Sequence, residues 1–178
     1  SELAVSGRNG AILAVEEINL AGGIHGTPIQ LVIRDDRDTP DGAIEAVKEL
    51  QREKVPVIIG HYTSGATIGS FDYVNEKKIL MISPTVSSSR FSNLDDYFFR
   101  IMPHNSFQGK ILAQTAVSKK IKTIAAIYEE TNKVYGQELY KHFSENYKIL
   151  GGKIIFLRSF VSGPNSDIFQ LAKDAAAS

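Results

Sequence analysis

The chain has 178 residues, of which 43% are hydrophobic and 22% charged, and its formal net charge is zero. This composition excludes intrinsic disorder, and the absence of excess positive charge argues against nucleic acid as a partner. Because the chain has no cysteine, disulfides and thiolate metal sites are excluded, and no apolar stretch approaches the roughly 20 residues needed to span a bilayer.

Short β-branched runs alternate along the chain with stretches that have helical spacing. The helical stretches predict helices at about 7–21, 40–53, 64–77, 105–119, 134–149 and 164–177. The apolar runs predict strands at 29–35, 56–60, 79–83, 97–102, 123–129 and 153–160. This alternation is typical of βα units around a parallel sheet, so the predicted fold class is α/β.

Several helix ends are marked by residues with known end preferences. Gly22 or Gly23 can take the left-handed conformation that stops the first helix. Pro40 suits a helix start, and Thr63 or Ser64 is a natural N-cap for the helix at 64–77.

The order of the predicted elements is unusual at both ends. A doubly wound sheet normally opens with a buried strand, whereas this chain opens with a helix. Its last helical pattern is followed by no further strand. We therefore expect the sequence to be a fragment that lacks a first strand.

Two predicted strand ends are rich in hydroxyl side chains, "GHYTSGAT" at 60–67 and "SPTVSSS" at 83–89. Ligands bind at the carboxyl ends of parallel strands, and a helix beginning near Ser64 offers unpaired N–H groups that favour an anion. Ser64 and Ser87 can each donate a hydrogen bond to a small carboxylate. The alternative is that these residues serve only as local caps and turns, where serine and threonine are common.

Enzymatic readings of the first turn are disfavoured. Residues 60–67 nearly match the phosphate loop G-x-x-x-x-G-K-[ST], but Ala66 stands where the lysine belongs, so a nucleotide-using α/β enzyme is disfavoured. A serine nucleophile in a G-x-S-x-G elbow is also disfavoured, because the sequence around Ser64 lacks the first glycine.

Metal and acid–base chemistry find equally little support. The acidic run "DDRD" at 35–38 is interpreted as a solvated loop. The four histidines lack metal-ligand spacing and are interpreted as surface or turn residues: His25, His61, His104 and His142. The sequence therefore predicts no catalytic residue, no metal site and no cofactor.

Four segments in order carry a resemblance to a known family. They are "AVEEINLAGGIHGTPIQLVIRDDRDTPDGAIEAVKEL", "VIIGHYTSGATIGSFDYVNEKKILMISPTVSSS", "FFRIMPHNSFQG" and "VYGQEL". Together they resemble the type I periplasmic binding proteins, specifically the branched-chain amino acid (leucine/isoleucine/valine) binding family. The resemblance implies a non-enzymatic clamp of two lobes, with residues 1–104 in the first lobe, 105–178 opening the second, and "PHNS" (103–106) as a hinge strand.

The resemblance also implies a function, a compartment and a set of site residues. The protein would capture an amino acid or similar small carboxylate for the membrane permease of an ABC transporter. It would be periplasmic or extracellular, delivered by a secretion signal or held by a lipid anchor. Ser64 and Ser87 would donate to the ligand carboxylate, the carbonyl of Thr85 would accept from its ammonium group, and Tyr135 would cover it.

Three further expectations follow from the sequence. Thr85 stands where the family often has alanine, so its hydroxyl either extends ligand recognition or bonds to backbone. The resemblance equally covers ligand-sensing domains of signalling receptors or regulators, which flanking sequence would distinguish from a transport protein. As a fragment, the chain would expose apolar faces, so oligomerisation or exchange of elements between copies is expected.

Overall fold

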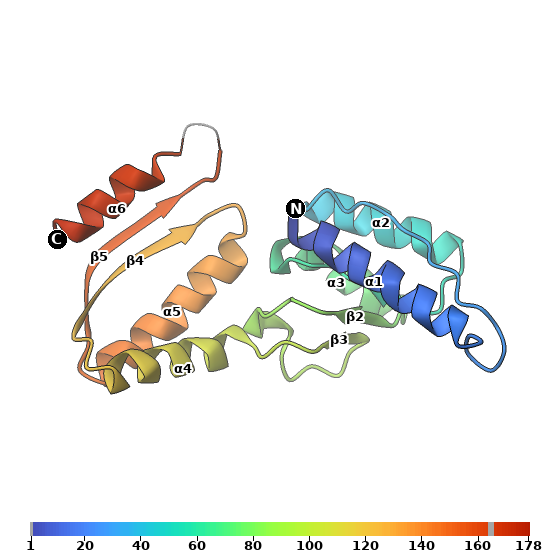
Figure 1. The fold of residues 1–178 in the computed structure, drawn as a ribbon, viewed down its shortest axis with the longest axis horizontal. Coiled ribbons are helices and arrows are strands. Elements are labelled where there is room, and N and C mark those ends of the chain that lie inside the picture. Colours follow the sequence, from blue (N-terminus) through green and yellow to red (C-terminus); the bar gives the residue numbers. More distant parts are fainter. Residues whose placement is uncertain (1, 164–165) are drawn as a thin grey trace. The chain divides into compact units, whose positions relative to one another are not determined.

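The computed structural model describes residues 2–163 and 166–178, which form two compact units (Figure 1). The first unit runs up to Val86 and also includes Asp95–Ile101. The second consists of Ser87–Leu94 together with the chain from Met102 onward. The lobe boundary near residue 104 that the sequence suggests stays a prediction.

The first unit is built from helices and a three-stranded parallel sheet. Its elements are α1 (Glu2–Leu20), α2 (Pro40–Arg52), β1 (Ile58–Ile59), α3 (Ser64–Glu76), β2 (Met81–Ser83) and β3 (Phe98–Arg100). The strand order is β1-β2-β3, with Ile59 opposite Ile82 and Ile82 opposite Phe99. The parallel pairing confirms the predicted α/β class.

The helix ends of this unit follow the expected chemistry. Gly23 has a φ of 73° at the end of α1, and its N–H donates to the carbonyl of Ile18 at 2.9 Å. Thr63 is the N-cap of α3, since its hydroxyl oxygen accepts from the N–H of Ala66 at 3.3 Å. Pro40 occupies the first turn of α2 as predicted.

The core of the first unit draws its side chains from α2, α3 and β2. Val47, Val74 and Met81 are fully buried there. The two helices approach closely at Gly69, where a Cβ atom would lie 2.1 Å from the carbonyl oxygen of Pro40. Only glycine therefore permits α3 to lie this near the start of α2.

The predicted strand at 29–35 is wrong, because the structure has no regular element there. Among the described strands none pairs with this segment, so no ladder of hydrogen bonds forms. Side chains bond to it instead. The Asn19 amide donates to the carbonyl of Ile29 at 2.9 Å and accepts from its N–H at 2.7 Å, and Arg34 pairs with Glu49 at 2.8 Å.

The second unit contains the short helix η1 (Ser89–Phe91) and a two-stranded parallel sheet with its helices. Its other elements are α4 (Asn105–Ser118), β4 (Thr123–Glu129), α5 (Lys133–Ile149), β5 (Lys153–Phe160) and α6 (Ile168–Ala176). Figure 1 shows α5 and α6 on opposite faces of the β4–β5 pair. The helix predicted at 164–177 begins later than expected, at Ile168. Positions 164–165 lie outside the described residues.

Tyr147 organises the core of the second unit. Its buried ring stacks on Phe143 with 5.2 Å between centroids and packs near Ala113 and Ala116. Its hydroxyl donates to the carbonyl of Ile121 at 2.9 Å, so the polar group of the buried ring is satisfied.

Candidate ligand-binding site

The two hydroxyl-rich turns follow adjacent strands, β1 and β2, and are bonded to each other. The Ser83 hydroxyl donates to the carbonyl of His61 at 2.6 Å, and the Thr85 hydroxyl donates to the carbonyl of Tyr62 at 2.6 Å. The hydroxyl of Thr85, which replaces a family alanine, therefore bonds to backbone.

Ser64 is the first residue of α3 and is only 2% exposed. The N-terminus of α3 lies at the carboxyl end of β1, where the partial positive charge of the helix dipole favours an anion. Thr63 caps this end, and the Thr67 hydroxyl donates back to the Thr63 carbonyl at 2.9 Å. The chain thus fixes the start of α3 through side chains on both sides of Ser64.

Ser87 and Tyr135 belong to the second unit. The Ser87 side chain is 2% exposed, and its carbonyl accepts from the N–H of Asn105 at 2.6 Å. Tyr135 lies in the first turn of α5 and is 37% exposed. The Asn105 amide donates to the carbonyl of Tyr135 at 3.5 Å, so Asn105 contacts the backbone of both predicted site residues.

Asn105 and Glu138 are positioning residues that the sequence did not reveal. Glu138 accepts from the N–H of Ser89 at 2.8 Å and from the Asn105 amide at 3.2 Å. The Glu138 side chain and the backbone N–H of Asn105 thereby tie the loop that carries Ser87 to helices α5 and α4, and the Asn105 side chain links these two helices. The only sequence signal was the position of Asn105 in "PHNS", which gave no indication of its partners.

Glu129 shapes the loop that leads from β4 to Tyr135. Its carboxylate accepts backbone N–H groups of Thr131 at 2.8 Å, Ser162 at 3.2 Å and Asn132 at 3.3 Å. Burial alone would raise the pKa of Glu129, but these bonds and one from the Thr131 hydroxyl lower it to about 2. The carboxylate is therefore ionised at neutral pH.

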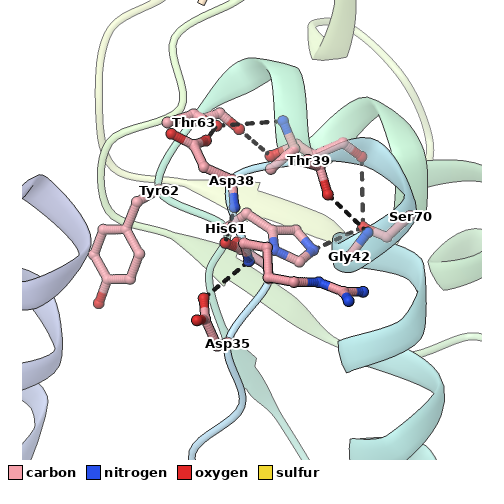
Figure 2. A network of polar contacts seen from close by, with 12 residues as sticks. Asp35, Asp38, Thr39, Gly42, His61, Tyr62, Thr63 and Ser70 are labelled. Carbon is pink, nitrogen blue, oxygen red and sulfur yellow. Dashed lines mark hydrogen bonds and ion pairs between the residues drawn. The ribbon is translucent and has the colours of Figure 1, made fainter. Parts of the chain in front are cut away.

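A buried polar cluster lies beside the first turn (Figure 2). His61 Nδ1 lies 2.7 Å from Asp36 Oδ2, and His61 Nε2 lies 2.9 Å from Ser70 Oγ. The hydrogen bond from His61 lowers the pKa of the Asp36 carboxyl, although burial acts in the opposite direction.

Two interpretations from the sequence need correction. His61 lies in a turn, as one of the two alternatives stated, but it is 5% exposed and therefore not a surface residue. The loop at 35–38 is not wholly solvated, since Asp36 binds His61 and Asp38 accepts from the Thr63 hydroxyl at 2.5 Å. The signal that could have revealed this was an acidic loop followed, one helix later, by a histidine at the end of an apolar strand.

A cavity of about 650 Å³ lies in the second unit between α4, β4 and α5. Tyr135 and Asn132 contribute to its lining, but its walls are mostly apolar side chains such as Leu112, Ile124 and Leu139. These walls lack the set of converging donors that the charged groups of an amino acid need. Within residues 2–163 and 166–178, no group of His, Asp and Glu side chains is placed to hold a metal ion.

The fold and the two bonded turns define a class of protein. A parallel α/β scaffold with hydroxyls and a helix N-terminus at adjacent strand ends is that of a small-molecule binding protein. The family model described as "Periplasmic binding protein" matches residues 1–178. The chain belongs to this family of binding proteins, which confirms the resemblance and the prediction that the protein is not an enzyme.

Curated relatives have names that refer to amino acids. The chain is 26% identical over 158 residues to a leucine-, isoleucine-, valine-, threonine- and alanine-binding protein of Pseudomonas aeruginosa. It is 32% identical over 148 residues to Leu/Ile/Val-binding protein homolog 1 of Brucella abortus. These alignments cover 88% and 82% of the chain but 42% and 39% of the relatives, so the chain spans less than half their length.

A solved structure has the same fold. It is the branched-chain amino acid transporter substrate-binding protein LivJ of Streptococcus pneumoniae in complex with isoleucine, with 32% identity and a TM-score of 0.81. The match covers 93% of this chain and 47% of that one. For the part of this chain that the structure describes, none of the helices is both long and apolar enough to cross a membrane.

Proposed function

We propose that the protein is an extracytoplasmic solute-binding receptor that captures a branched-chain or similar small amino acid for an ABC transporter. The observation that carries this proposal is the pair of hydrogen bonds from Ser83 and Thr85 to the turn after β1. They hold two hydroxyl-rich loops together beside the N-terminus of α3, where a carboxylate is favoured.

The ligand roles follow the chemistry of an amino acid. Ser64 and Ser87 donate their hydroxyl hydrogens to the ligand carboxylate, and the carbonyl of Thr85 accepts from the ligand ammonium group. Tyr135 covers the bound ligand with its ring. Each hydrogen bond to a charged group contributes about 1.5–3 kcal/mol, so a few of them suffice for firm and reversible capture.

The relatives support the choice of ligand, partner and compartment. One is named for binding leucine, isoleucine, valine, threonine and alanine, and the LivJ structure contains isoleucine. The LivJ protein is described as the substrate-binding protein of a transporter, so the partner proposed for this chain is a membrane permease. Family membership favours the periplasm or the outer surface of the cell.

A thermal-shift panel of the twenty amino acids and small organic acids tests the proposal. A ligand at 100 times its Kd stabilises the folded protein by about 2.7 kcal/mol, so leucine, isoleucine or valine should give the largest rise in Tm. In the Ser64→Ala, Ser87→Ala double variant that rise should disappear, because the loss of two charge-assisted bonds weakens binding about 10²–10⁴-fold.

The matched control is the double variant Ser6→Ala, Ser118→Ala, which removes one exposed helical serine from each unit. It should keep the full ligand-induced rise. Unchanged affinity in the Ser64→Ala, Ser87→Ala protein would remove the site assignment. A wild-type protein that none of the amino acids stabilises would remove the proposed function itself.

A further inference from the structure

The turn after β1 (residues 60–64) accepts hydrogen bonds from Ser83 and Thr85, and it also donates hydrogen bonds to the acidic loop at 35–38. His61 donates its Nδ1–H to Asp36 Oδ2 at 2.7 Å, and the Thr63 hydroxyl donates to Asp38 Oδ1 at 2.5 Å. The carbonyls of His61 and Tyr62 also accept from the hydroxyls of Ser83 and Thr85. Each of the three successive turn residues 61–63 is therefore hydrogen-bonded to a group outside the turn.

The acidic loop is itself ordered. The N–H of Arg37 donates to Asp35 Oδ1 and the N–H of Asp38 donates to Asp36 Oδ1, both at 2.9 Å. Arg37 and Asp38 both have left-handed backbone, with φ of 53° and 54°. The loop therefore presents two carboxylates in a fixed arrangement to the turn that ends in Ser64.

His61 extends this contact into the interior of the unit. A carboxylate accepts hydrogen bonds only, so Asp36 places a ring hydrogen on Nδ1. The other ring nitrogen, Nε2, lies 2.9 Å from the Ser70 hydroxyl oxygen, within hydrogen-bond distance. Ser70 lies in α3, so the chain of contacts links the acidic loop, the turn and the helix that begins at Ser64.

The same three residue types form the catalytic triad of serine hydrolases, but the burial of this set excludes that role. Ser70 is 0% exposed and His61 is 5% exposed. A nucleophile must reach its substrate, and the Ser70 oxygen is enclosed in the packed interior. The set therefore acts on the conformation of the chain.

We propose that Asp36, His61 and Ser70 form a positioning relay that holds the turn from Gly60 to Ser64 in its ligand-ready geometry before a ligand arrives. A binding turn that is ordered in advance loses less conformational entropy on binding, so the relay raises affinity. The predicted effect of the relay on ligand affinity rests on the proposed function. Its predicted effect on the conformational order of the turn does not.

Three variants test the relay. His61→Phe removes both ring contacts at similar volume, and Ser70→Ala removes one contact with little change in packing. Val74→Ala is the matched control, because Val74 is a fully buried residue of the same helix outside the relay. Isothermal titration with L-isoleucine and amide hydrogen exchange at His61, Tyr62 and Thr63 are measured for each, together with Tm.

We expect both relay variants to bind L-isoleucine with a Kd about tenfold higher than wild type, because the turn is no longer ordered before the ligand binds. Exchange at the three turn amides should rise by about the same factor. Val74→Ala should lower Tm as much as Ser70→Ala does while its Kd and the turn exchange stay near wild type.

The relay is overturned if affinity falls in step with Tm in all three variants, or if the relay variants exchange the turn amides at the wild-type rate. If the wild-type protein binds no amino acid, the proposed function fails. In that case the amide exchange rates of the turn alone test whether the relay orders the turn.

Discussion

Glu129 keeps its charge because backbone N–H groups from two loops donate to it. Its pKa is lowered to about 2, so its contribution to stability is fully present above the ordinary value of 4.5 and is lost as pH falls toward 2. Glu129→Gln should therefore lower Tm at pH 7, and the difference from wild type should shrink steadily between about pH 5 and pH 2.

The neighbouring Glu130→Gln variant is the control, because the three backbone bonds go to Glu129. Thermal unfolding followed by circular dichroism at a series of pH values measures both variants. A Tm difference for Glu129→Gln that is the same at pH 7 and pH 2.5 would contradict the ionised, bonded carboxylate.

The sequence predicted residues whose chemistry is local, and it missed those whose partners are distant. The sequence narrows the cap of α3 to Thr63 or Ser64, and Thr63 fills the role because its partner, the N–H of Ala66, is only three positions away. His61 was misread because its partner Asp36 is 25 positions away and in another loop. Asn105 was missed for the same reason, since its side chain bonds to Glu138 in the next helix.

Two helix glycines differ in what a side chain would meet. A Cβ atom on Gly69 of α3 would lie 2.1 Å from the carbonyl oxygen of Pro40, whereas one on Gly10 of α1 would meet no atom within 4 Å. Gly69→Ala should therefore destabilise the protein by about 1–3 kcal/mol through overpacking. Gly10→Ala should stabilise it by about 0.5–1 kcal/mol, because alanine favours the helix.

Urea unfolding of the two variants measures both free energies. The pair is matched, because each change adds one methyl group to a glycine inside a helix. A Gly69→Ala protein as stable as wild type would contradict the close approach of α3 to the start of α2.

Most helices and strands could be predicted because their periodicity and end residues agree. The helices starting at Pro40, Ser64 and Asn105 begin at or beside the predicted positions. The failure at 29–35 has a physical cause. An apolar, β-branched run shows that a segment suits a strand, but a strand also needs a neighbour to complete its hydrogen bonds, and sequence alone does not supply the neighbour.

The four residues predicted to bind ligand are divided between the two units, with Ser64 and Thr85 in the first and Ser87 and Tyr135 in the second. In the second unit, Asn105 bonds to the carbonyls of Ser87 and Tyr135. In the first unit, the hydroxyl of Thr85 bonds to the turn that leads to Ser64. The fold class, the family and the adjacency of the first two turns were predictable. The ligand roles stay predictions, because they depend on chemistry that only a bound ligand can reveal.

The central claim is that hydroxyl and N–H groups at the sheet edge reversibly bind a carboxylate. Calorimetric titration with L-isoleucine and with 2-methylbutylamine, the same molecule without its carboxylate, tests this claim most directly. We predict that isoleucine binds and is released without chemical conversion. The amine should bind at least about 100-fold more weakly, since it lacks the carboxylate that accepts two charge-assisted hydrogen bonds. Equal affinity for the amine, or chemical conversion of isoleucine, would contradict the account.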